Sequence, residues 1–262
     1  MMKAILKFTL AAAVSLVALE ASAGGFAVRE QSATAQGFSF AGATTSSAGL
    51  SAMYWNPAAV TSMPGINFES HAALILGFAK MTPTTGSGPL VLTDPGTGNI
   101  AQPAIVPASY SSYQVNERLF VGISLNSPFG LVTKSDTYSA AQLYGRSSKA
   151  FNVVATPTIG YVVNDWLSVA AGVQVGYLDV SLKQAQPLGA TLPALIAATG
   201  PNAVTSNLSG DAWGVGYTLG ATLKPWQGGE IGIGFRSSMN YALKGSFQID
   251  GQATRPIKAT LN

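Results

Sequence analysis

Few side chains in this sequence are of a type and in a place suited to binding another molecule. The clearest are three cations, Arg236, Lys244 and Lys183, since arginine and lysine hold carboxylates through charge-assisted hydrogen bonds. Arg236 and Lys244 fall among the polar residues of an alternating segment, and Lys183 stands where a long loop is expected to begin. Ordinary roles also fit, because Glu69 could neutralise Arg236 and Lys183 could be solvated. The sequence therefore leaves these cations as candidate ligand-binding residues.

Catalytic chemistry finds little support in the same residues. A covalent mechanism needs a nucleophile beside a general base. The only histidine, His71, has no serine or aspartate partner at a readable spacing, cysteine is absent, and no cluster of metal-ligand residue types stands out. We expect no enzyme, no metal and no cofactor, and a membrane-embedded lipase is the least favoured alternative.

The N-terminus has the organisation of a secretory signal peptide. Lys3 and Lys7 precede an apolar run over residues 8–19, which ends in Ala21-Ser22-Ala23. A transmembrane anchor is the alternative, but a helix needs about 20 apolar residues to span a bilayer. We predict Sec-dependent export with cleavage after residue 23.

The composition favours a membrane protein that crosses by strands. Charged residues make up 10% of the chain, against about 25% in soluble domains. Glycine, serine, threonine and asparagine interrupt every later apolar stretch, so no further transmembrane helix is expected. The net charge of +3 comes from scattered lysines and arginines, which argues against nucleic-acid binding. Without cysteine, a disulfide framework is excluded.

Alternation of apolar and polar residues supports this interpretation. Over residues 213–223 every second residue is apolar and the others are small, and the pattern resumes over residues 231–244. A lipid-facing arginine costs about 2–4 kcal/mol at the bilayer midplane, so the side with Arg236 and Lys244 is predicted to face the lumen. The predicted lipid-facing side of the second segment contains Ile231, Ile233, Phe235, Met239, Tyr241 and Leu243.

Seven strands can be counted in this way, with an interruption in the fifth. There the apolar phase inverts at Leu178, after about the length that spans a bilayer, and the strand is expected to leave the membrane or to bulge. Short connections alternate with long ones at residues 79–99, 130–148 and 184–210, as periplasmic turns alternate with extracellular loops. The predicted strands cover residues 66–78, 104–115, 119–127, 151–163, 167–183, 213–223 and 231–244.

The number of strands and the N-terminal composition complete the predicted architecture. Seven strands leave two unpaired edges in lipid, so we expect the sequence to be the first half of a longer barrel. Residues 24–65 are small and apolar without alternation, and burial inside the barrel as a plug would explain them. The fold class is all-β, a transmembrane antiparallel β-barrel with an N-terminal plug.

The mature chain resembles the FadL-type outer-membrane transporters of long-chain fatty acids. The resemblance runs from residue 24 to about residue 245 and is sharpest at Asn56-Pro57-Ala58, after a small-residue segment and before alternating strands. It also rests on Gly24-Gly25-Phe26, Glu30, Gly42, Ala48-Gly49 and residues 208–214 and 241–245.

The resemblance implies a barrel of 14 strands, closed by a hatch and opened sideways at a kinked third strand. The matching kink is Asn126-Ser127-Pro128-Phe129-Gly130, and proline cannot donate to the ladder there. Alternatively, Pro128 simply ends the strand. The resemblance places Phe26 near an inner pocket and Asn56, Pro57 and Ala58 in the hatch backbone. It also implies an outer groove at the loop 185–203, where Leu188, Leu192, Leu195 and Ile196 have helical spacing.

The expected function is passive, gated diffusion of long-chain fatty acids across the bacterial outer membrane by a monomer surrounded by lipid. One alternative keeps the fold and changes the cargo to aromatic hydrocarbons such as toluene, which need no cation. A second alternative is a general porin, against which the glycine-rich inner face and the predicted plug argue.

Overall fold

The computed structural model describes residues 27–82, 96–135, 139–187, 189, 191–200 and 202–261. The predicted signal peptide and Phe26 therefore lie outside the described residues. The described strands form one ten-stranded antiparallel sheet, which confirms the predicted all-β class. In the same part of the chain, none of the helices has the length and apolar character needed to cross a membrane.

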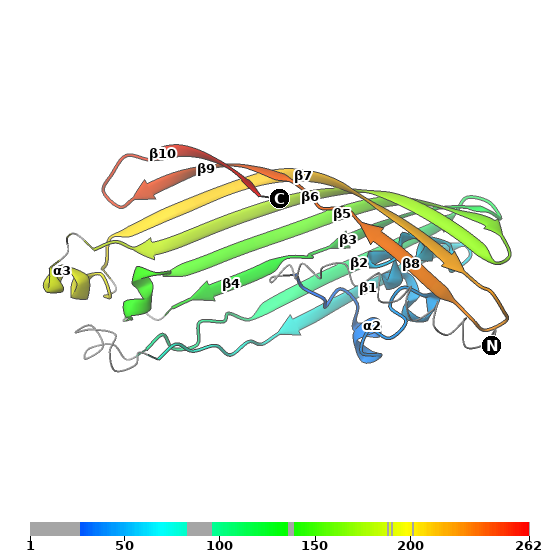
Figure 1. Ribbon diagram of the computed structural model, residues 1–262, viewed down its shortest axis with the longest axis horizontal. Coiled ribbons are helices and arrows are strands. Elements are labelled where there is room, and N and C mark those ends of the chain that lie inside the picture. The colour runs from blue at the N-terminus through cyan, green and yellow to red at the C-terminus, as the bar shows by residue number, and fades with distance from the viewer. Residues whose placement is uncertain are drawn as a thin grey trace, which may run out of the picture.

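The sheet is a wall whose strands follow one another in chain order. β3 and β4 both pair with β5, and β8 and β9 both pair with β7, so each of these couples is one interrupted strand of the wall. β1 and β10 form the two edges (Figure 1). The strands are β1 (Ile66–Ile75), β2 (Ala104–Gln114), β3 (Leu119–Asn126), β4 (Gly130–Lys134), β5 (Ser147–Asn164), β6 (Leu167–Ala185), β7 (Thr205–Leu223), β8 (Ile231–Arg236), β9 (Tyr241–Ile249) and β10 (Arg255–Leu261).

Two predictions about the strands were wrong, and a third left two alternatives open, of which the structure excludes one. β10 lies past the last predicted strand, and β4 lies within the predicted loop 130–148. β6 has no bulge at Leu178: its pairing with β7 keeps one register from Leu167 opposite Leu223 to Ala185 opposite Thr205. Backbone hydrogen bonds set this register, so the strand continues where its side-chain pattern inverts.

The two faces of the wall differ as the alternation predicts. On β6, Val169, Val173 and Val175 are exposed on one face, whereas Gly172 and Gln174 are buried on the other. We call the exposed, apolar face the outer face and the opposite one the inner face. A chain in lipid requires this arrangement, because apolar side chains then contact the hydrocarbon.

The N-terminal segment, residues 27–65, packs on the inner face. Its helices lie near the end of the wall that carries the short turns (Figure 1). Leu50, Met53 and Val60 are buried there against Tyr110 and Phe120 of the wall. The helices are α2 (Ala33–Gly37), η1 (Ser46–Tyr54) and η2 (Pro57–Thr61).

Glycines of the wall make room for this packing. A Cβ added to Gly122 would lie 2.6 Å from the Val60 side chain, and one added to Gly160 would lie 2.4 Å from it. Gly49, with φ of +68°, lies inside η1 and brings the backbone close to the Glu69 carboxylate. The small inner residues predicted from the alternation are therefore the contact surface of the N-terminal segment.

The opposite end of the wall carries the long connections and two short helices. η4 (Ala140–Leu143) follows β4, and α3 (Leu192–Ala197) lies between β6 and β7. α3 contains Leu192, Leu195 and Ile196, whose spacing predicts a helix, while Leu188 lies outside the described residues.

Candidate functional site

The wall is interrupted between β3 and β4, at Ser127–Phe129. β3 pairs with β5 through Asn126 opposite Val154, and β4 resumes with Gly130 opposite Phe151. The register differs by one residue across Pro128, which has no N–H to donate. Because β4 continues beside the same neighbour, the structure favours the predicted kink over a simple strand end.

The same interruption opens a gap between β2 and β4. Pairing of β2 with β3 ends at Ser109 opposite Leu125. The chain before β2 meets β4 again only at Ala101 opposite Thr133, where Lys134 N–H donates to Ile100 O at 2.9 Å. Between these points no strand pairing joins the described residues of the two strands. We call this stretch the gap.

The N-terminal segment lies against β3–β4 at the gap. Val28 N–H donates to Pro128 O at 2.8 Å, and Ala27 forms an antiparallel bridge with Phe129. Phe26, the residue predicted to lie near an inner pocket, directly precedes this bridge and lies outside the described residues. The start of the described chain thus satisfies backbone groups that the interrupted strand leaves without a neighbour.

A buried polar network fixes this contact. The Tyr110 hydroxyl donates to Gln31 O at 2.8 Å, and Asn126 Nδ2 donates to the Tyr110 oxygen at 2.8 Å and to Gln31 Oε1 at 3.2 Å. All three side chains are buried. Sequence analysis missed Gln31 and Tyr110, since their partners are far away along the chain and each residue alone is unremarkable.

Arg236 faces inward, as predicted, and binds the N-terminal segment. One guanidinium nitrogen donates to Tyr54 O at 2.6 Å, another donates to Gln174 Oε1, and the group lies 4.5 Å from the Tyr54 ring centre. Burial raises the pKa of Tyr54 above its usual range, so the ring stays a neutral phenol. Among the described residues Arg236 has no carboxylate partner.

The predicted alternative partner of Arg236, Glu69, is bound elsewhere. Glu69 Oε1 lies 2.5 Å from His71 Nε2, and Oε2 accepts a hydrogen bond from Ser51 N–H at 3.2 Å. His71 Nδ1 accepts from Ala33 N–H at 3.3 Å. Both side chains therefore tie the N-terminal segment to β1.

Lys244 and Lys183 face outward, so the predicted inward position of Lys244 was wrong. Lys244 is opposite Asp211, and Lys183 is opposite Asn207, on the face that carries Trp213. The pairing of β7 with β8 and with β9 differs by one residue, and a one-residue shift exchanges the two faces of a strand. Lys183 also lies within β6 and not at the start of a loop.

The same shift brings apolar residues to the inner face. Met239, Tyr241 and Leu243, predicted to face lipid, pack with Leu178, Val180 and Ala212 in what we call the inner apolar cluster. Asn152 Nδ2 donates to the Tyr241 hydroxyl at 2.9 Å, and Asn152 Oδ1 has no hydrogen-bond partner within the described part of the chain.

The inner apolar cluster lies level with the gap. Asn152 N–H donates to Phe129 O, Asn152 is opposite Leu178, and Leu178 is opposite Ala212. One cross-strand row therefore leads from the apolar cluster to the strand interruption.

Asn56, Pro57 and Ala58 anchor the N-terminal segment to β7. Asn56 Nδ2 donates to Thr44 O, Ala221 O and Thr222 Oγ1, and Asn56 Oδ1 accepts from Ala58 N–H at 3.0 Å. Asn56 caps η2, and Pro57 occupies its first turn, where no N–H is needed.

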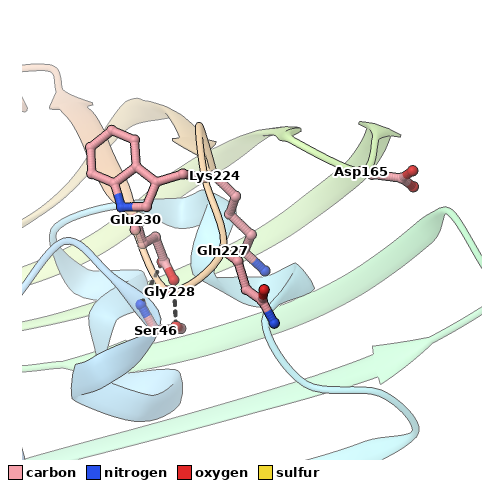
Figure 2. A pocket seen from close by; sticks show the side chains of 8 residues that line it. Ser46, Asp165, Lys224, Gln227, Gly228 and Glu230 are labelled. Atoms are coloured by element: carbon pink, nitrogen blue, oxygen red, sulfur yellow. Dashed lines mark hydrogen bonds between the residues drawn. The ribbon is translucent and has the colours of Figure 1, made fainter.

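A second anchor lies at the end with the short turns. Glu230 accepts from Ser46 N–H at 2.7 Å and from Ser46 Oγ at 2.5 Å (Figure 2). These two residues line a cavity of about 500 Å³, together with Lys224, Trp226 and Asp165. The N-terminal segment is thus held at its far side as well as at the gap.

The family model described as "Outer membrane protein transport protein (OMPP1/FadL/TodX)" matches residues 14–261. This chain belongs to that family. Its members are outer-membrane proteins, and this is the membrane that the outer face contacts.

Relatives support the assignment. The chain is 30% identical to the 47 kDa outer membrane protein of Pasteurella multocida (strain Pm70), over 92% of this chain and 56% of that protein. It is 24% identical to the long-chain fatty acid transport protein of Escherichia coli (strain K12), over 93% of this chain and 58% of that protein. The chain therefore spans a little over half the length of these FadL-family relatives.

Solved structures share the fold. A FadL homologue from Pseudomonas aeruginosa superposes with a TM-score of 0.63 at 21% identity, over 86% of this chain and 55% of that one. The toluene transporter TbuX of Ralstonia pickettii superposes with a TM-score of 0.55 at 20% identity, over 81% and 59%. At these identities the likeness concerns the FadL-type wall and not its cargo.

Proposed function

We propose that this chain forms the hatch and first wall strands of an outer-membrane transporter that lets hydrophobic molecules diffuse passively through a gated opening. The gap between β2 and β4, covered by the start of the N-terminal segment, is the observation that carries the proposal. Residues 24–65 would be the hatch.

The gap is the place where the wall opens most readily. Elsewhere, separating two strands in lipid would expose a whole ladder of backbone groups at several kcal/mol each. At the gap, release of Val28 from Pro128, of Ala27 from Phe129 and of the Gln31 side chain is sufficient. A small movement of the hatch would therefore open a lateral path into the bilayer.

The inner face offers an apolar approach to this path. The inner apolar cluster shares a cross-strand row with Phe129. A hydrophobic molecule bound to the cluster would therefore lie at the same level along the strands as the gap. Transport, and not catalysis, also agrees with His71, whose contacts with Glu69 and Ala33 hold the hatch.

We propose a long-chain fatty acid as the cargo. Arg236, opposite Thr218, supplies a cation without a carboxylate partner among the described residues. The residue of β6 opposite Thr218 is Gly172. Gly172 lies six residues before Leu178 of the inner apolar cluster, which corresponds to about 20 Å along the strand. That span suits an extended acyl chain with its carboxylate at Arg236, and it exceeds the length of a single aromatic ring.

The cargo is tested by uptake into cells that express the complete protein. Arg236→Met is expected to lower oleate uptake about tenfold, the loss of one charge-assisted bond, and to leave toluene uptake within about twofold of wild type. Arg236→Lys is the control that keeps the charge. Equal loss of both cargoes would exclude a carboxylate site, and unchanged oleate uptake would favour the aromatic alternative, which needs no cation.

Transport through the gap is tested with a reversible disulfide cross-link. This sequence contains no cysteine, so the two introduced cysteines have no competing thiol in it. Directly opposed antiparallel residues lie about 4.5–5.5 Å apart at Cα, within the range of a disulfide. Ala27→Cys with Phe129→Cys should abolish uptake when oxidised, and reduction should restore it. The matched control is Ser70→Cys with Ser109→Cys, which places a disulfide in the continuous pairing of β1 with β2. The hydroxyls of these two serines lie 3.3 Å apart. Full uptake through the oxidised Ala27–Phe129 pair would refute the gating role of the gap.

A further inference from the structure

The outer face carries a band of polar residues beyond the apolar part of the wall. Tyr177 and Trp213 mark the boundary, with ring centres 5.2 Å apart on adjacent strands. Trp213 is exposed and Tyr177 is half-buried. Such aromatic side chains lie at the interface between hydrocarbon and headgroups. The two next outward residues on β6 are Asp179 and Ser181, followed by Lys183.

The polar band lies at headgroup depth. Lys183 is six residues beyond Tyr177, which corresponds to about 20 Å along the strand and about 14 Å in height at a tilt of about 45°. A lysine side chain reaches several ångströms back toward the interface. The ammonium group can therefore meet lipid headgroups just above the aromatic boundary.

Five strands contribute to one row in this band. Lys134 of β4 is opposite Ser147, which is opposite Lys183, and the row continues through Asn207 to Gln248 of β9. Two cations alternate with hydroxyl and amide groups along it. These are donors suited to phosphate oxygens, whose charge-assisted bonds are the strong ones.

The row lines a concavity of about 460 Å³. Arg146 contributes a third cation and is held by a bond from its guanidinium to Thr205 Oγ1 at 2.8 Å. Among the described residues of the lining there is one carboxylate, Asp250, which accepts from Thr205 N–H at 2.9 Å. The concavity is therefore positively charged.

Among the residues that the structure describes, no neighbouring charge neutralises the two lysines. Lys149, one row closer to the aromatic boundary, is paired with Asp179 at 3.1 Å. Within the described residues, neither Lys134 nor Lys183 forms an ion pair, and both are exposed. Their charges remain available to a ligand on the outer face.

We propose that this concavity binds the phosphorylated headgroup of an outer-leaflet glycolipid, with Lys134 and Lys183 holding the phosphate and Asn207 and Gln248 donating to neighbouring oxygens. The long connections lie at this end of the wall, which identifies it as the extracellular end. Its acyl chains would lie along the apolar face beneath the Tyr177–Trp213 pair. The site is on the outer face, so the inference is independent of the proposed transport through the lumen.

Binding is measured with the complete protein purified in detergent, with diphosphorylated lipid A as the probe and thermophoresis as the readout. Each lysine near a lipid surface is expected to contribute about fivefold to affinity. Lys134→Gln with Lys183→Gln should therefore weaken binding by about 25-fold. The matched control is Lys224→Gln, an exposed lysine at the opposite end of the wall, which should leave affinity unchanged.

Additional variants and ligands give results that could contradict the proposal. Lys134→Arg with Lys183→Arg should retain the lipid, and the unfolding midpoint of the glutamine pair should match wild type, because both side chains are exposed. Equal weakening by Lys224→Gln would show unspecific charge attraction and overturn the proposal. Undiminished binding of dephosphorylated lipid A would exclude a phosphate site, and displacement of the lipid by equimolar inorganic phosphate would assign the site to free anions.

Discussion

The carboxamide of Gln31 binds Ser127 at both ends: Nε2 donates to Ser127 O at 2.9 Å, and Oε1 accepts from Ser127 N–H at 3.2 Å. Across the interruption of β3–β4, one side chain thus takes the place of a neighbouring strand. This explains how a wall in lipid tolerates a missing stretch of pairing, since both backbone groups remain bonded. It also makes the closure of the gap depend on a group that can move.

Gln31→Ala should therefore loosen the hatch at the gap. Loss of the carboxamide removes the partners of the Ser127 N–H and C=O groups and one of the two acceptors of Asn126 Nδ2, at about 1–3 kcal/mol. We expect a lower unfolding midpoint in detergent and faster hydrogen exchange at residues 27–31. The control is Gln36→Ala, an exposed glutamine on α2. If both variants unfold at the same temperature, the bonds of Gln31 contribute nothing to closure.

The strands were predictable from the sequence because lipid enforces alternation of side chains. The outer residues of β6 and β7 follow it from the short-turn end up to the aromatic boundary. Beyond Tyr177 that pressure ends and the side-chain pattern inverts, so the sequence left open whether the strand leaves the membrane or bulges, and the continuous pairing with β7 excludes the bulge. β10 was missed for a related reason, because charged and polar residues in 255–261 mask its pairing with β9.

The site was only partly predictable. Pro128 marks the interruption by its own chemistry, and Arg236 faces inward because a lipid-facing arginine is costly. Lys244 was misplaced because the one-residue shift between β8 and β9 leaves no signal in the side chains. Gln31 is bonded to Tyr110 and to Ser127, which lie 79 and 96 positions away, and no local pattern contains such contacts.

Glycines on the inner face of β8 should resist enlargement. A Cβ on Gly234 would lie 1.8 Å from Trp55 O, so the hatch backbone would have to move. We expect Gly234→Ala to destabilise the protein by about 1–3 kcal/mol or more, as overpacking does, seen as a lower unfolding midpoint. Gly37→Ala is the control, because no atom lies within 4 Å of its added Cβ. A Gly234→Ala protein as stable as the control would mean that the hatch does not pack this closely.

Glu230 should hold the hatch at the end with the short turns. Glu230→Ala removes the two carboxylate oxygens that accept hydrogen bonds from Ser46. Hydrogen bonds to a charged group contribute about 1.5–3 kcal/mol. That range is an upper limit here, because the pair is partly exposed. The expected result is faster hydrogen exchange at residues 44–48 with little change at residues 27–31. Asp165→Asn serves as control, since Asp165 lines the same cavity and points away from Ser46 (Figure 2). Equal exchange in the two variants would show that the Ser46 contact is not an anchor.

Asn56 should be the most sensitive position in the hatch. Its side chain is fully buried and makes four hydrogen bonds, three as donor to Thr44, Ala221 and Thr222 and one as acceptor from Ala58 N–H. Asn56→Asp keeps the shape and the acceptor but replaces the donor group with a buried carboxylate that faces three oxygens. Each unpaired buried group costs about 1–3 kcal/mol, and more where a charge is involved.

The aspartate variant should therefore be less stable than Asn56→Ala, the reverse of what size alone predicts. Unfolding midpoints of the two variants, measured in the same detergent, give the comparison. Asn67→Asp controls for added charge at a position that is only partly buried. If Asn56→Asp were the more stable variant, Asn56 would act mainly by filling space, and the hatch would be joined to β7 by packing around Pro57 and Gly220 in place of hydrogen bonds.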